Sequence, residues 1–432
     1  MNSVALVDSS FYGSEKLGLR SLRALEIEDM PICIEWVGLK GENLFPQLER
    51  LVVRDCKELR QIPNVPISIR HIEIHNVGLH AIPLPPLLLS SDTSASSTMS
   101  LSLSKLLISF CPNLESLWQG SYSLPALEEL SIEECVSLSC LPEDSLGSLS
   151  ILDNLEIMKC PNLMTGEIRW PPTVRWFTLG LCGDVKSPLI DSLQSLKSLS
   201  RLFLDGCAMP ILPSEALASL TGVISMVFSN CTMTSLPSVE ALTRLKNLEY
   251  LDIWDCKELV SLDGIQWLEK LSFLTISGCS SLFRGSPDQS IEGAGISGCV
   301  LKLSELDVDH PSLLLKEPLR SITTVKKLRI SGSPEPTILP EDWLLRNCQA
   351  LEEIVLSNAS HLRCLPQEMA SLTSLWSLQI SHGNMLQALP NMPASLTNLR
   401  IDNCHSELKK RCKRNVGHDW DKIAHVSDMD IC

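Results

Sequence analysis

Aliphatic residues recur along this 432-residue chain in a fixed order of hydrophobic and polar positions. The clearest copy runs from Leu248 to Leu262 and reads L-x-x-L-x-I-x-x-C-x-x-L-x-x-L, with Ile253 at its centre and Cys256 three residues later. About 16 copies are present, and most of their centres lie 21 to 26 residues apart. The central residues are Ile27, Val53, Ile74, Ile108, Ile132, Ile157, Leu179, Leu204, Phe228, Ile253, Ile276, Val308, Ile330, Leu356, Ile380 and Ile401.

Each copy predicts a short strand followed by a return segment. In L-x-I the two aliphatic side chains point to one face of the strand, and the residue between them points to the other. A single copy cannot bury its own apolar face, whereas stacked copies can. The pattern therefore predicts an α/β leucine-rich-repeat solenoid, a curved horseshoe of about 16 repeats with a parallel β-sheet on its concave face.

The repeats divide the chain into three parts. We expect residues 1–18 to form an N-terminal lead-in, residues 19–405 the leucine-rich-repeat array and residues 406–432 a C-terminal tail. Two long steps between repeats place inserts near 84–102 and 284–299, and their short polar residues are typical of surface loops. Inserts in a solenoid often project from a binding face, but a tolerated loop without a role is the simpler interpretation.

Cysteine is frequent, with 17 residues, and ten of them occupy one position of the repeat. An odd number of cysteines in a long chain without a C-x-x-C pair favours reduced thiols over a disulfide framework. A buried thiol behaves as a small apolar group, so we interpret the ten as a buried ladder, with redox or metal chemistry as the alternative. They are Cys56, Cys111, Cys135, Cys160, Cys182, Cys207, Cys231, Cys256, Cys279 and Cys404.

The charge balance narrows the range of partners. The chain carries 36 Lys and Arg against 51 Asp and Glu, a formal net charge of −15. Such an acidic surface repels phosphate, so we expect neither nucleic acid nor anionic membrane as a partner. No apolar run approaches the roughly 18 residues that a membrane span needs, and no secretion signal is apparent. We therefore expect a cytoplasmic or nuclear protein.

The repeats and the tail together resemble one family. Copies of the form C-x-x-L-x-x-L-P, and the ending from Leu408 through Cys412 to GHDWDKIAHV (417–426), are similar to the leucine-rich-repeat region of plant nucleotide-binding leucine-rich-repeat (NBS-LRR) disease-resistance proteins. The G-x-x-x-x-G-K-[ST] motif expected of that family's nucleotide-binding domain is absent, so we expect the repeat portion alone.

The resemblance implies a function in plant defence. It implies the protein-recognition domain of an intracellular immune receptor, which senses a ligand or holds the receptor inactive through its concave face. The implied partner is a protein: a pathogen effector, a host target or the receptor's own nucleotide-binding domain. A free-standing repeat adaptor, such as a ubiquitin-ligase substrate adaptor, is the alternative.

The residues between the inward strand positions are expected to form the recognition surface on the concave face. In the middle of the array they combine aromatic rings with charges, a composition found at interaction hot spots. Scattered surface aromatics without a role are the alternative. The candidate protein-binding residues are Trp176, Arg201, Phe203, Asp205, Tyr250, Asp252, Trp254, Asp255 and Phe273.

Two acidic groups are predicted on the same face, where each meets either a basic partner or only solvent. They are Glu129, Glu133 and Glu134 with Ser131, and Glu305, Asp307 and Asp309. 

Enzyme chemistry is not indicated. His71, Glu73 and His75 alternate along one strand, but no further metal ligand accompanies them. Neither G-x-S-x-G nor H-E-x-x-H occurs, and no cysteine has a histidine partner that the sequence identifies. We therefore predict no catalytic residue, no metal and no cofactor. The alternative is a hydrolase or redox enzyme that uses one of the thiols.

Overall fold

The computed structural model describes residues 4–8, 19–38, 44–85, 100–118, 123–141, 146–147, 149–163, 169–182, 192–208, 214–284, 301–331 and 339–432. The chain divides into two compact units. Unit 1 contains residues 1–209 and 215–222, and unit 2 contains residues 210–214 and 223–432. Most of each predicted insert, at 86–99 and 285–300, lies outside the described residues.

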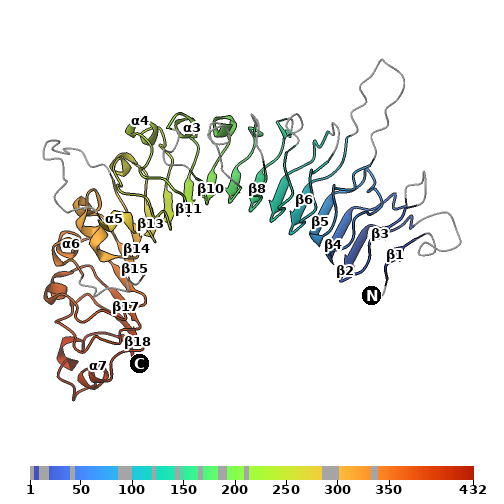
Figure 1. Cartoon of the computed structure of the whole chain (residues 1–432). Coiled ribbons are helices and arrows are strands. Elements are labelled where there is room, and N and C mark those ends of the chain that lie inside the picture. Colours follow the sequence, from blue (N-terminus) through green and yellow to red (C-terminus); the bar gives the residue numbers. More distant parts are fainter. Residues whose placement is uncertain are drawn as a thin grey trace. The chain divides into compact units, whose positions relative to one another are not determined.

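Unit 1 is built on a parallel sheet whose strands follow one another in chain order (Figure 1). Its strands are β2 (Ala24–Glu28), β4 (Arg50–Cys56), β5 (His71–Val77), β6 (Lys105–Ser109), β7 (Glu129–Glu133), β8 (Asn154–Met158), β9 (Trp176–Gly180) and β10 (Arg201–Asp205). A separate two-stranded sheet pairs β1 (Leu6–Val7) with β3 (Glu35–Trp36).

Unit 2 repeats the same architecture. Its parallel strands are β11 (Ser225–Ser229), β12 (Tyr250–Trp254), β13 (Phe273–Ser277), β14 (Glu305–Val308), β15 (Lys327–Ile330), β16 (Glu353–Leu356), β17 (Ser377–Ser381), β18 (Asn398–Asp402) and β19 (Asp428–Ile431). The two sheets confirm the leucine-rich-repeat solenoid, and each of the 16 predicted centres lies in its own strand.

The register confirms the inside–outside assignment within each unit. In unit 1 the predicted centres pair from Ile27 to Val53 and onward to Leu204, and in unit 2 they pair from Phe228 to Ile401. Except for Ile27 on β2, all of these side chains are at most 3% exposed. The residues between them form the opposite face of each sheet, which we call the open face.

The turn after each strand explains the cysteine position. The residue before that position has a positive φ in repeat after repeat, as at Glu134 (53°) and Lys159 (54°). This bend turns the backbone so that the N–H of Glu134 donates to the carbonyl of Met158, at the end of the next strand (3.0 Å). The Cys160 thiol donates to the same carbonyl (3.4 Å). A small side chain with a weak donor therefore suits this position.

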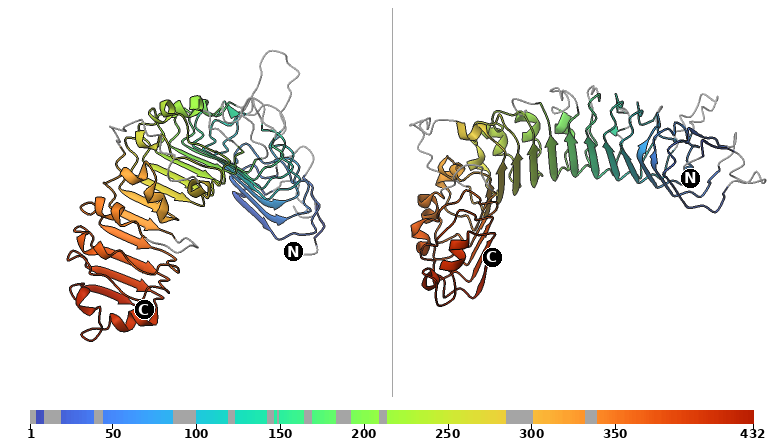
Figure 2. Two further views of the ribbon diagram at one scale, coloured as in Figure 1. Left: turned by 60° about the vertical axis from the view of Figure 1, so that its left-hand side comes forward. Right: turned by 60° about the horizontal axis from the view of Figure 1, so that its bottom comes forward.

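Short return segments complete each repeat and lie on the other side of the sheet (Figure 2). The α-helices are α3 (Ser214–Ala218), α4 (Val239–Leu242), α5 (Ser281–Arg284), α6 (Glu341–Arg346) and α7 (Ser406–Arg411). The 3-10 turns are η2 (Ser192–Ser195), η3 (Ile265–Trp267), η4 (Pro311–Leu315), η5 (Leu319–Ser321), η6 (Gln367–Ser371) and η7 (Trp420–Lys422). Most of their leucines are buried, although Leu315 of η4 is exposed, so the core of each unit is mostly aliphatic.

The predicted boundary between array and tail stops one strand short. β19 lies within residues 406–432, yet it pairs with β18 in the same register, with Ile431 beside Ile401. The spacing of Val426, Met429 and Ile431 repeats the strand pattern, and this signal could have identified a seventeenth strand.

The tail segment 417–426 is held by a buried carboxylate. The Asp419 side chain has no exposed surface and accepts hydrogen bonds from both Nε (2.8 Å) and Nη2 (2.9 Å) of Arg411. It also accepts from Lys422 Nζ (2.7 Å) and from the backbone N–H of Leu389 (3.1 Å). His425 Nε2 lies 2.8 Å from the carbonyl of Pro393. The tail is thus fastened to the return segment of an earlier repeat.

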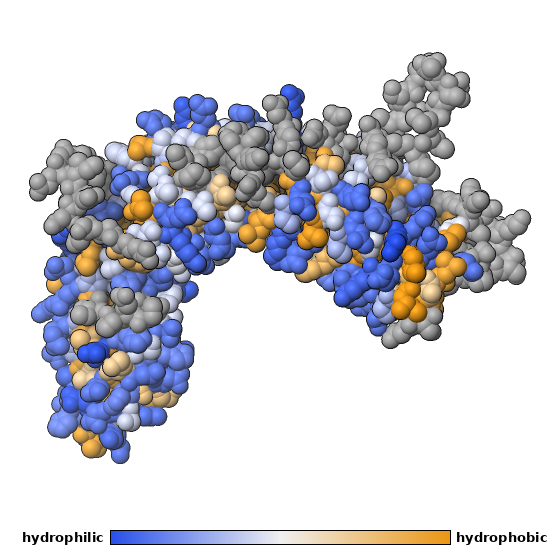
Figure 3. Space-filling model, viewed as in Figure 1, coloured by the Kyte–Doolittle hydropathy of each residue, from blue (hydrophilic) through white to orange (hydrophobic). Residues whose placement is uncertain are grey.

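Exposed apolar side chains are mostly scattered among polar ones (Figure 3). One group lies near the N-terminus, where Leu6, Ile32, Ile34 and Val37 are each 45 to 49% exposed. In the parts of the chain that the structure describes, no helix is long and apolar enough to cross a membrane.

Candidate protein-recognition surfaces

The predicted binding residues form two groups, one in each unit. In unit 1 Trp176 on β9 stands beside Arg201 on β10, because the strands pair these two positions directly. The Arg201 guanidinium carbon lies 4.5 Å from the centre of the Trp176 ring, a cation–π contact. The Trp176 side chain is 47% exposed. Phe203, two residues along β10, is half-buried on the same face.

Asp205 was expected to be exposed on this face, and that expectation is wrong. Asp205 is only 8% exposed. Its register partner on β9 is Gly180, which has no side chain. A Cβ atom placed on Gly180 would lie 2.8 Å from the Cβ of Asp205 and 2.7 Å from the sulfur of Met158. The side chains of Asp205 and Met158 therefore close over the glycine, which removes Asp205 from the accessible surface.

In unit 2 the aromatic residues form a stacked pair. Tyr250 on β12 and Phe273 on β13 are register partners, and their ring centres lie 4.5 Å apart with the planes 8° from parallel. Tyr250 is 39% exposed, while Phe273 is half-buried. Trp254, at the end of β12, is also 39% exposed. Aromatic rings that are held in place by stacking, and that are partly exposed on the open face, are well suited to contact a protein partner.

The two predicted aspartates of unit 2 differ in position. Asp252 lies between Tyr250 and Trp254 on β12 and is half-buried on the open face. Asp255 lies beyond the strand in the turn, with φ 51°, and is exposed. Its backbone N–H donates to the carbonyl of Ser277 (2.8 Å), so Asp255 lies at the rim of the open face.

Acidic residues lie on the open face of unit 2 next to the aromatic pair, on and after β14. Asp307 on β14 accepts a hydrogen bond from Ser331 (3.0 Å) and lies 4.0 Å from Arg329. Asp309 accepts a hydrogen bond from the backbone N–H of Gly278 (2.6 Å). Burial, together with the nearby charges of Asp252 and Asp309, raises the pKa of Asp307. Negative charge on this face is thus only partly balanced within the unit.

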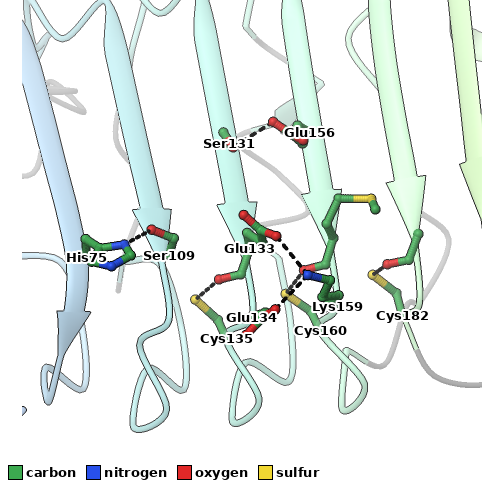
Figure 4. A network of polar contacts seen from close by, with 12 residues as sticks. His75, Ser109, Ser131, Glu133, Glu134, Cys135, Glu156, Lys159, Cys160 and Cys182 are labelled. Atoms are coloured by element: carbon green, nitrogen blue, oxygen red, sulfur yellow. Dashed lines mark hydrogen bonds and ion pairs between the residues drawn. The ribbon is translucent and has the colours of Figure 1, made fainter. Parts of the chain in front are cut away.

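The acidic group of unit 1 is partly balanced by lysines of the same unit (Figure 4). Lys159 Nζ bonds the carboxylates of Glu133 (3.1 Å) and Glu134 (2.6 Å). Lys105 pairs with Glu129 (2.6 Å), and Ser131 donates to Glu156 (2.9 Å). This group therefore presents less unpaired charge than its sequence indicated.

The histidines that alternate along β5 lie beside polar side chains of the same unit. His71 lies 3.6 Å from Glu73, whose carboxylate is held by Arg54 at 2.6 Å. Nδ1 of His75 lies 2.8 Å from the hydroxyl of Ser109 on the neighbouring strand (Figure 4). Within the described ranges, three potential metal ligands come together only at Asp402, Asp430 and Cys432, which are all exposed.

The thiol ladder is buried as predicted along nine of its ten members, and Cys404 is half-buried. Burial raises the pKa of Cys56, and it raises the pKa of Cys279 to about 12. Hydrogen bonds with the ladder thiols Cys135 and Cys160 instead lower the pKa of Cys111 and Cys182. A thiol with a raised pKa is a poor nucleophile at neutral pH. In this arrangement the ladder packs the core and supplies weak hydrogen bonds to the turns.

Residues 10–161 match a family described as "Plant disease resistance protein RPS2-like, leucine-rich repeats". A disease resistance-like protein of Arabidopsis thaliana, DSC1, is 29% identical over 40% of this chain and 14% of its own length. The TMV resistance protein N of Nicotiana glutinosa is 27% identical over 53% of this chain and 20% of its own length.

A solved leucine-rich-repeat protein of Leptospira interrogans is 17% identical, with a TM-score of 0.48, over 98% of this chain and 95% of its own. The sequence matches confirm the resemblance to the leucine-rich-repeat region of plant NBS-LRR disease-resistance proteins. The chain spans no more than a fifth of the length of the two curated relatives named above.

Proposed function

We propose that this chain is the non-catalytic protein-recognition repeat domain of a plant intracellular immune receptor. Its open face binds either a pathogen or host protein or the receptor's own nucleotide-binding domain. Exchange between these two contacts shifts the receptor between inactive and active populations. The receptor acts in the cytoplasm or the nucleus.

The observation that carries this proposal is the placement of the aromatic residues. Aromatic residues are only 5% of the chain. Even so, Tyr250 and Phe273 stack on adjacent strands of unit 2, and Trp176 stands under Arg201 in unit 1. Anchors of this kind carry most of the binding energy at protein interfaces. The similarity to disease-resistance proteins supports the biological setting.

The test is an association assay with purified proteins. The intact chain is titrated with the nucleotide-binding domain of each candidate resistance protein from the source organism, expressed as a separate polypeptide. Two double variants remove the anchors, Tyr250→Ser with Phe273→Ser and Trp176→Ser with Arg201→Ser. We expect at least one of them to weaken binding by about tenfold or more, because truncated hot spots cost about 2 kcal/mol.

The matched control is Val260→Ser, a residue of unit 2 that is 62% exposed and lies outside the strands. This variant should bind like the unchanged chain. If both anchor variants bound as tightly as the unchanged chain, or if only the control lost binding, recognition would be assigned to another face. Binding to a ubiquitin-ligase subunit in place of any nucleotide-binding domain would favour the adaptor.

A further inference from the structure

The helix α7 lies at the C-terminal end of unit 2 (Figure 1). A hollow lies beside it. Its volume is about 540 Å³. Part of its lining is apolar, from Met429 and Ile431 of β19 and from Cys412. The remainder comes mainly from the lysines at 409, 410 and 413.

The apolar floor exists because β19 is incompletely covered. Met429 and Ile431 occupy the inward positions of the strand, as register partners of Leu399 and Ile401. Leu399 and Ile401 are fully buried, whereas Met429 and Ile431 are only half-buried. The strand positions that are buried on β18 are thus partly accessible on β19.

The backbone of β19 offers unused hydrogen-bonding groups at this place. The N–H groups of Asp428 and Cys432 donate to carbonyls of the β18 repeat, of Thr397 (2.9 Å) and Ile401 (3.0 Å). Since successive residues of a strand alternate in direction, the N–H and C=O groups of Met429 and Ile431 point to the opposite edge. In the described part of the chain β19 pairs with β18 alone. Such an edge is a template for an added strand.

The charge at this edge selects among possible strands. Among the described residues, no ion pair engages Lys409 or Lys413, and Lys410 only meets the exposed Glu407 at 3.4 Å. The other face of β19 carries the exposed carboxylates of Asp430 and of Asp428, which pairs with Arg400 at 3.5 Å. An incoming strand therefore meets positive charge on its hollow-facing side and negative charge on its other side. This division favours acidic residues on one side of that strand only.

We propose that β19 accepts an extended acidic–aliphatic segment of another protein by strand addition. The backbone of the segment pairs with Met429 and Ile431. Its aliphatic side chains enter the hollow, and its carboxylates on the same side meet Lys409 and Lys413. This surface is separate from the aromatic anchors of the open face.

The test uses the intact chain and a labelled peptide, Glu-Thr-Val-Thr-Val-Thr-Glu, whose alternate residues carry the charges and the valines. Fluorescence anisotropy should show saturable binding. The double variant Lys409→Glu with Lys413→Glu should weaken it about tenfold or more, and so should replacing both glutamates of the peptide by lysine. Lys246→Glu, the same charge change at an exposed lysine elsewhere in unit 2, should leave binding unchanged.

Strand addition has a signature that charge attraction lacks. Two further peptides are N-methylated, one at the odd and one at the even positions. Only one set of amides faces β19 in an added strand, so one of these peptides should lose binding and the other should keep it. Equal binding by both, or undiminished binding of the lysine peptide, would overturn the proposal. A second copy of the chain could instead occupy this edge. In that case a dimer would form that the acidic peptide does not dissociate, and this result would also overturn the proposal.

Discussion

The buried carboxylate of Asp419 offers a quantitative test of how the tail is held. Burial alone would raise its pKa, but the hydrogen bonds from Arg411 and Lys422 lower it from 3.8 to about 2. One pKa unit corresponds to about 1.4 kcal/mol, so ionised Asp419 contributes about 2 kcal/mol to the folded tail at neutral pH. Asp419→Asn keeps the shape and one acceptor and should lose about this amount.

The sign of the pH dependence follows from the direction of the shift. Because the folded pKa is depressed, the contribution is present above pH 4 and disappears as the pH falls towards 2. Roughly half of it should remain at pH 3. The difference between the unchanged chain and Asp419→Asn should therefore shrink over this window.

Hydrogen exchange is a suitable assay, because a long repeat array need not unfold in one step. The amides of Leu389 and Asp419, which donate to Asp419 and Arg411, should exchange about 30-fold faster in Asp419→Asn at pH 7. The control is Asp421→Asn, an exposed carboxylate two residues away, which should exchange like the unchanged chain. Equal protection in the two variants, or a difference that persists at pH 2, would refute the role assigned to Asp419.

Two further results are expected from the strands and the thiols. Leu251→Asp should destabilise unit 2 by about 4 kcal/mol or more, because Leu251 is 3% exposed and a charge there has no partner. Asp252→Ala should change the free energy of unfolding by less than about 0.5 kcal/mol. Urea unfolding followed by circular dichroism separates the two, and equal effects would contradict the assignment of inner and outer faces. Alkylation of the native chain at pH 8, read by peptide mass spectrometry, should modify the exposed Cys140 and Cys364 long before Cys56 or Cys279. A ladder thiol that reacts as fast as Cys364 would instead favour the thiol enzyme.

Much of the fold follows from hydrophobic spacing, because spacing decides which side chains can be buried together. Ile253 and Leu251 could be placed inside from the sequence, and their register partners too, since every repeat has the same pattern. The seventeenth strand was missed because its spacing from Ile401 is longer than the common step. The resemblance of segment 417–426 to a family ending gave no indication that Asp419 fastens it.

The recognition surface was less predictable, because alternation along one strand says nothing about its neighbours. It places Tyr250 and Phe273 on the open face, and the register then stacks them. It also places Asp205 there, but Gly180 on the preceding strand leaves room for the Asp205 side chain to lie against the sheet. Likewise, Lys159 follows its strand rather than lying in it, so the sequence alone did not reveal that it pairs with both Glu133 and Glu134.

The constant register has a consequence for how such a gene can change. Cys231 and Cys256 occupy equivalent places, so recombination that joins one to the sequence after the other deletes 25 residues and preserves every remaining pairing position. The shortened protein still folds by the same rules, but it lacks Tyr250 and leaves Phe273 beside a different strand. Unequal exchange between repeats is therefore a route to new binding specificity that does not require a new scaffold.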